Sequence, residues 1–111
     1  MPHCIIEHSK NIDGKALIPL VFSGALKSEL FEMDGKDIKV RALSFTDHQS
    51  GDEITSFAHI TLKILSGRNT EQKSLLSQSV LEQLKTLKLS SCSLSVEVVD
   101  IDRVSYAKVV T

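Results

Sequence analysis

The chain of 111 residues contains no tryptophan, a single tyrosine and almost no net charge. Proteins that bind nucleic acid use a basic surface, and those that bind single strands also use aromatic side chains on which bases stack. Thirteen basic and 14 acidic residues give a net charge of −1 with histidine counted as neutral. The chain supplies neither a positive field nor stacking surfaces, so we expect no nucleic-acid partner.

The sequence also lacks long apolar runs and cysteine-rich motifs. No run approaches the roughly 20 residues of a membrane-spanning helix, and Glu7 and His8 stand where a signal peptide would continue its apolar core. Cys4 and Cys92 form no CxxC pair, and the four histidines do not cluster at metal-ligand spacing. We therefore expect a cytoplasmic protein with no membrane contact, no disulfide and no metal site.

The apolar residues that are present predict one α+β domain over residues 1–111, because this length supports a single two-layer core. Alternation indicates strands and helical spacing indicates helices. The expected order is a strand over 3–9, a helix over 15–31, strands over 38–45 and 54–65, a helix over 69–87 and a strand over 94–101. A polar segment over 46–53 separates the two β-α-β units.

Capping residues mark both helix starts. Asp13 is a typical N-cap, and Asn69 with Gln72 three residues later has the spacing of a capping box. Pro19 conflicts with the first helix, because a proline inside a helix costs about 3 kcal/mol. The first helix is therefore expected either to kink near Pro19 or to begin close to it.

A repeat of about 56 residues relates the two halves, which span residues 2–45 and 54–101. His3 corresponds to His59 and Ile38 to Leu94, and the caps Asp13 and Asn69 obey the same shift. Two β-α-β units of this kind predict a four-stranded sheet with both helices on one face. The other face includes apolar residues, so we expect oligomerisation to cover it.

Pro2 gives the start of the chain a possible chemical role. If Met1 is removed, Pro2 becomes a chain-terminal secondary amine at the tip of a strand. An α-amino group has an ordinary pKa of roughly 7.7–8.0, so modest burial or a nearby cation makes it a base near neutral pH. While Met1 remains, the Pro2 nitrogen is a tertiary amide and cannot act as a base. The bland alternative is a proline that merely leads into a strand.

Three segments resemble the 5-carboxymethyl-2-hydroxymuconate Δ-isomerases of the tautomerase superfamily. They are Pro2-His3-x-Ile5-Ile6-Glu7-x-Ser9-x-Asn11-Ile12, His59-Ile60-Thr61-Leu62-Lys63-Ile64-x-x-Gly67-Arg68, and the basic pair within Ile38-Lys39-Val40-Arg41. The similarity covers the chain up to about Ile101. It implies the tautomerase fold, a homotrimer with the sheets facing inward, no cofactor, and Pro2 as general base.

The resemblance further implies a small anionic substrate, a dienol carboxylate from homoprotocatechuate (4-hydroxyphenylacetate) breakdown. Pro2 would take a proton from the 2-hydroxyl side and return one to a distant carbon, which gives the 2-oxo isomer. Lys39, Arg41 and Arg68 are then the expected substrate-binding cations, because guanidiniums grip carboxylates bidentately. The family has arginine where this chain has Lys39, so substrate specificity can differ. A solvated turn arginine is the plainer interpretation of Arg68.

Two alternatives stay open at this point. One is a tautomerase that acts on another 2-oxo acid or enol, which the lysine at position 39 favours. The other is an oligomeric βαββαβ binding module without catalysis, which shares the order of elements but not the chemistry. The tail over 102–111 includes three valines and a tyrosine. It is too apolar to stay in water, and we expect it to pack on a neighbouring subunit.

Overall fold

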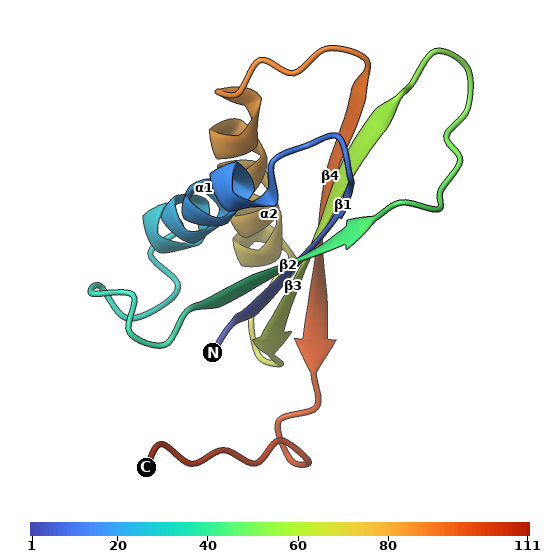
Figure 1. Cartoon of the computed structure of the whole chain (residues 1–111). Helices are drawn as coiled ribbons and strands as arrows, with labels where there is room; N and C mark the ends of the chain where they lie inside the picture. The colour runs from blue at the N-terminus through green and yellow to red at the C-terminus, as the bar shows by residue number, and fades with distance from the viewer.

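The computed structural model describes all residues from Met1 to Thr111. Its elements are β1 (His3–Ser9), α1 (Gly14–Lys27), β2 (Lys39–Phe45), β3 (Ser56–Leu65), α2 (Thr70–Lys85) and β4 (Cys92–Ile101). The four strands form one sheet in the order β2-β1-β3-β4, and both helices cover the same face of it (Figure 1). The predicted α+β class and the two β-α-β units are therefore confirmed.

The sheet joins the two units through their first strands. β1 runs parallel to β2, β3 runs parallel to β4, and the central pair β1 and β3 is antiparallel, with His3 opposite Lys63. The antiparallel centre brings the start of β1 to the end of β3. His3 and Lys63, which lie about 60 positions apart in the chain, thus meet at one end of the sheet.

The observed boundaries follow the predicted repeat. α1 starts at Gly14 and α2 at Thr70, and the first strands end at Ser9 and Leu65. Both caps also form: the Asp13 side chain accepts a hydrogen bond from the Lys15 N–H, and Asn69 and Gln72 make the reciprocal capping box. The same local signals therefore start both helices.

The first helix starts within one residue of its predicted start but ends earlier than predicted. It runs through Pro19, which lies exposed five residues after the start, so the Lys15 carbonyl freed by the missing N–H can be solvated. It ends at Lys27 and not near residue 31. The end is set by Ser28, whose hydroxyl donates to the Ala25 carbonyl, and by Glu29, whose φ of 62° leaves the helical region.

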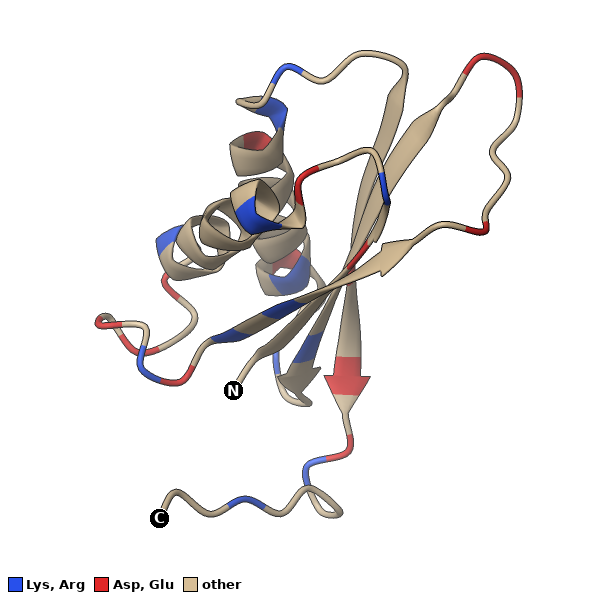
Figure 2. Cartoon of the chain, in the orientation of Figure 1, with Lys and Arg blue, Asp and Glu red and all other residues tan.

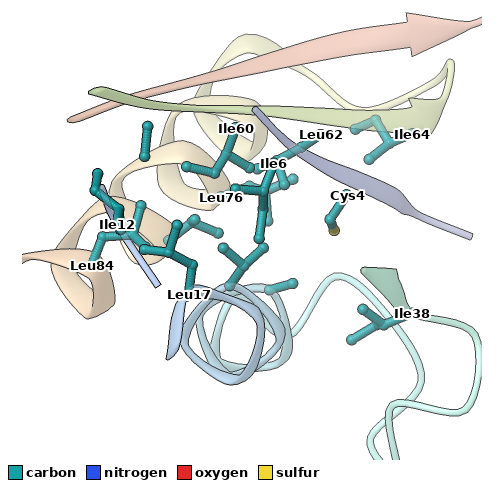
Figure 3. Close-up of a cluster of buried hydrophobic side chains, with 14 residues drawn as sticks. Cys4, Ile6, Ile12, Leu17, Ile38, Ile60, Leu62, Ile64, Leu76 and Leu84 are labelled. Carbon is teal, nitrogen blue, oxygen red and sulfur yellow. The ribbon is translucent and has the colours of Figure 1, made fainter. Parts of the chain in front are cut away.

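The core lies between the sheet and the helices. Cys4 and Ile6 of β1 and alternate residues of β3 point towards Leu17 of α1 and Leu76 of α2 (Figure 3). The core-facing residues of β3 alternate along the strand, and Ala58, Ile60, Leu62 and Ile64 are all buried. Burial of this alternation fixes the register of the sheet, because a slip of one residue would expose the whole set.

The helix-free face of the sheet is more polar than the sequence suggested. Leu43 and Val99 are exposed on it, but His59 bridges Ser95 and Glu97 through its two ring nitrogens, with distances of 2.7 Å and 2.5 Å. Acidic and basic residues are interspersed over the whole chain and form no field of one sign (Figure 2). Neither helix is long and apolar enough to cross a membrane.

Gly24 permits the close contact of the two helices, and its replacement by alanine is expected to lower the free energy of unfolding by about 1–3 kcal/mol. An added Cβ would lie 2.6 Å from the Val80 Cα and 3.0 Å from the Ser79 carbonyl oxygen, so backbone must move. Gly51→Ala is the matched control, because nothing lies within 4 Å of its Cβ position. Urea unfolding of both variants tests this; equal midpoints would contradict it.

Candidate active site

A pocket of about 430 Å³ opens at the end of the sheet where the chain begins. In Figure 1 the N-terminus, the α1–β2 loop, the end of β3 and the tail all lie at this end. The lining comes from these four segments: Met1, then Leu30, Phe31, Glu32, Met33 and Asp37, then Ile64, Leu65 and Arg68, and finally Arg103. The antiparallel β1–β3 pair is what places the first residue beside Arg68.

Pro2 lies buried directly behind Met1, which forms part of the pocket wall. Its carbonyl oxygen accepts a hydrogen bond from the Lys39 N–H at 3.1 Å, so the sheet holds the residue in place. The Met1 amine donates to the Asp37 carbonyl oxygen at 2.7 Å. Removal of Met1 would make the Pro2 nitrogen the terminal amine, next to a residue position that lines the pocket.

The electrostatic surroundings favour a neutral amine at this position. Burial lowers the pKa of the Met1 amine below its ordinary value, and the positive charges of Lys39 and Lys108 lower this pKa further. Asp37 and Cys4 act in the opposite direction. The net effect is a terminal amine that loses its proton more readily than a free one, as a base near neutral pH requires.

Arg68 reaches the pocket from the turn between β3 and α2. Gly67 makes that turn with a φ of 126°, a conformation that favours glycine. The Arg68 Nη2 donates to the Leu30 carbonyl oxygen at 2.6 Å, which ties the α1–β2 loop to the guanidinium. A helix N-terminus can supply N–H donors for an anion, and α2 begins two residues after Arg68. This N-terminus does not line the pocket, and its capping box already pairs the N–H groups of Asn69 and Gln72.

The two basic residues of β2, Lys39 and Arg41, share a face of the strand but bind different partners. The Lys39 Nζ donates to the Asp37 carbonyl oxygen at 3.1 Å, beside the terminal amine. Arg41 points along the helix-free face, where its Nη1 lies 3.2 Å from the His3 Nδ1. Of the three predicted cations, only Arg68 lines the pocket; Lys39 lies beside the terminal amine without lining it, and Arg41 lies outside it.

Sequence reasoning missed three polar residues of this pocket, Glu32, Asp37 and Arg103. Arg103 lies just beyond β4 and donates from Nε and Nη2 to the Ser66 carbonyl oxygen, at 3.1 Å and 2.9 Å. Its position depends on the path of the tail, which no local pattern predicts. Asp37 had a usable signal, because the register that pairs His3 with Lys39 also sets residue 1 opposite Asp37.

The remaining titratable groups near the pocket have structural roles. Burial raises the pKa of the Cys4 thiol to about 12, so this cysteine is an unreactive core residue. His3 has both ring nitrogens paired, one with Arg41 and the other with the Tyr106 hydroxyl at 3.1 Å. No group of three or more histidine, cysteine or acidic side chains is arranged to hold a metal ion.

The sequence profile of the 5-carboxymethyl-2-hydroxymuconate isomerase family matches residues 2–109. The chain belongs to this family. It is therefore an isomerase with the tautomerase fold, as the resemblance of its opening residues predicted. None of the curated proteins matches this family member significantly in sequence.

Solved structures share the fold of this isomerase at low sequence identity. A 5-carboxymethyl-2-hydroxymuconate delta-isomerase superposes with a TM-score of 0.75 at 16% identity, over 98% of this chain and 88% of its own. The 5-carboxymethyl-2-hydroxymuconate isomerase from Deinococcus radiodurans R1 gives 0.74 at 20% identity, over 96% and 87%. A symmetric trimer of fused 4-OT gives 0.78 at 13% identity, over 96% and 90%.

Proposed function

We propose that this isomerase moves a proton within a dienol carboxylate such as 5-carboxymethyl-2-hydroxymuconate and yields the 2-oxo isomer. Pro2, terminal after removal of Met1, is the general base. The observation that carries the proposal is that Met1, directly ahead of the buried Pro2, lines one pocket together with Arg68. No metal or organic cofactor takes part, because one amine that accepts and returns a proton suffices for the reaction.

The proton transfer follows from the environment of the amine. A neutral Pro2 removes the proton of the 2-hydroxyl group, and negative charge spreads over the conjugated system towards the far carbon. The resulting ammonium then protonates that carbon. Burial and the charge of Lys39, which lower the pKa of the Met1 amine, would act on a Pro2 amine in the same direction.

The substrate's carboxylates need cations at fixed positions. Arg68 supplies a guanidinium at the pocket, Lys39 a point charge beside the amine, and Arg103 a second guanidinium on the opposite segment. Two guanidiniums and a lysine suit a substrate with more than one carboxylate. A lysine in place of the family's arginine favours the second candidate, a tautomerase for another 2-oxo acid or enol. The non-catalytic binding module is set aside by the family match.

We propose that the assembly is a homotrimer. We further propose that it acts in the cytoplasm, in homoprotocatechuate breakdown. The support comes from the trimeric fused 4-OT of the same fold and from exposed apolar residues of the single chain. Val104 is 94% exposed, and Val109 and Val110 are each 81% exposed. Contact with a neighbouring subunit would bury these side chains. With the sheets facing inward, Arg41 and His3 belong to the subunit contact, and Arg41 meets substrate only there.

A substrate panel tests the proposal. The Met-free protein, verified by intact mass, should convert 5-carboxymethyl-2-hydroxymuconate with a kcat/KM at least about tenfold above that for 2-hydroxydienoates with one carboxylate, since a hydrogen bond to a charged group contributes about 1.5–3 kcal/mol. Loss of the dienol absorbance measures the rate. Sedimentation equilibrium of the same preparation should give three times the 12.2 kDa chain mass. A Met-free protein inert on every dienol would refute the proposed reaction, and a monomer would refute the trimer.

A further inference from the structure

Asp37 contains the one buried side-chain oxygen or nitrogen of the chain that has no hydrogen-bond partner, its Oδ1. An unpaired buried carboxylate oxygen is costly, and folded proteins rarely keep one without a reason. Asp37 lines the pocket, two residues before the start of β2. A donor that arrives with the active form of the protein would therefore satisfy this oxygen.

The β1–β2 ladder shows which group of the chain lies next to the Asp37 backbone. In a parallel pair, every second residue of a strand bonds to the residues before and after its register partner. Lys39 is opposite His3 and donates to the Pro2 carbonyl oxygen, as this pattern requires. Two residues before Lys39, the same pattern sets the Asp37 carbonyl oxygen opposite the Pro2 nitrogen. An internal proline has no N–H, and the Met1 amine occupies this acceptor at 2.7 Å.

Removal of Met1 changes this acceptor's partner. The neutral Pro2 amine has one N–H and one lone pair. If the N–H donates to the Asp37 carbonyl oxygen, the direction of the lone pair is fixed by the ring and by that bond. Proton uptake then creates a second N–H and a positive charge beside the Asp37 side chain.

We propose that Asp37 is the positioning residue of the Pro2 base: its carbonyl oxygen orients the amine, and its carboxylate balances the charge of the ammonium formed during turnover. The inference rests on the proposed function and adds a residue to it. It accounts for the unpaired Oδ1, whose missing partner is the ammonium that exists only after Met1 is removed and a proton is taken up.

Several other charged groups act on the same amine. Lys39 of β2 and Lys108 of the tail lower the pKa of the Met1 amine, after burial, and Asp37 and Cys4 raise it. The pocket wall adds the charged side chains of Glu32, Arg68 and Arg103. Among the groups that raise this pKa, Cys4 keeps its own proton because its pKa is about 12. The Asp37 carboxylate is therefore the counterion that a substitution can remove.

Titration of the Met-free protein with ¹⁵N-labelled proline tests the role directly. Asp37→Asn should lower the pKa of the Pro2 amine by about one unit, a tenfold loss of proton affinity. The acidic limb of the kcat/KM profile should move to lower pH with it, and kcat should fall as the base weakens. Asp34→Asn is the control, since Asp34 is an exposed carboxylate of the same loop whose Oδ1 accepts from the Lys36 N–H. It should leave the titration unchanged.

Asp37→Glu separates charge from folding, because it keeps a carboxylate and should restore most of the amine pKa. An Asp37→Asn protein with the wild-type titration overturns the inference, as does an equal shift in Asp34→Asn. Failure of the proposed function gives a different result. In that case activity survives when the terminal amine is acylated, whereas failure of the Asp37 role alone leaves the amine essential and its titration unmoved.

Discussion

A protein with an alanine inserted between Met1 and Pro2 is expected to lose isomerase activity about a thousandfold while it keeps its fold. Met1 removal then leaves alanine as the first residue, and the Pro2 nitrogen is a tertiary amide without a basic lone pair. A positioned general base contributes about 10²–10⁴-fold to a rate, so the loss should fall in that range. The structure accommodates a residue ahead of Pro2, since the Met1 amine bonds to the Asp37 carbonyl oxygen there.

Intact mass, a thermal melt and initial rates on 5-carboxymethyl-2-hydroxymuconate are the measurements. Pro2→Ala is the control that keeps an amine at the start of the chain, and it should retain more activity than the insertion variant. Its primary amine lacks the ring that fixes the nitrogen, so we expect a partial loss. An insertion variant as active as the Met-free protein would show that Pro2 is not the base.

The fold was predictable because its signals are local and occur twice. Alternation in residues 59–64 and helical spacing in 76–84 each define a buried face, and the shift of 56 residues relates the caps Asp13 and Asn69. The end of α1 was not predictable in the same way. The apolar residues Leu30 and Phe31 continue a helical spacing, but the backbone leaves the helix at Glu29 and turns them to the pocket.

The candidate site was predictable where a motif and a strand pairing agree. Pro2 and Arg68 were both named from the family resemblance, and the antiparallel β1–β3 pair brings the start of β1 and the end of β3 to the same end of the sheet. Arg41 shows the limit of a strand pattern, because sharing a face with Lys39 does not determine where its long side chain points; His3 holds it on the helix-free face. Arg103 depends on the tail's path, a long-range property that sequence spacing does not encode.

Arg68→Ala is expected to lower kcat/KM for a dicarboxylate dienol by about 100-fold, mainly through KM. A hydrogen bond to a charged group contributes about 1.5–3 kcal/mol, and a guanidinium that binds a carboxylate acts on bound substrate and transition state alike. Arg68 also donates to the Leu30 carbonyl oxygen at 2.6 Å, so the alanine variant loses a contact of the α1–β2 loop. A thermal melt of the variant measures how much stability is lost with this contact.

Two further variants show whether binding depends on the planar guanidinium of Arg68, on its local positive charge, or only on the net charge of the protein. Arg68→Lys keeps the charge but not the planar fork, and should recover only part of the affinity. Lys27→Ala removes one positive charge at the exposed end of α1 and should leave KM unchanged. If Arg68 binds a carboxylate, its loss should affect a monocarboxylate dienol less than a dicarboxylate. Equal losses on both substrates would instead assign Arg68 to the stability of the loop, and an unchanged KM would remove it from the substrate site.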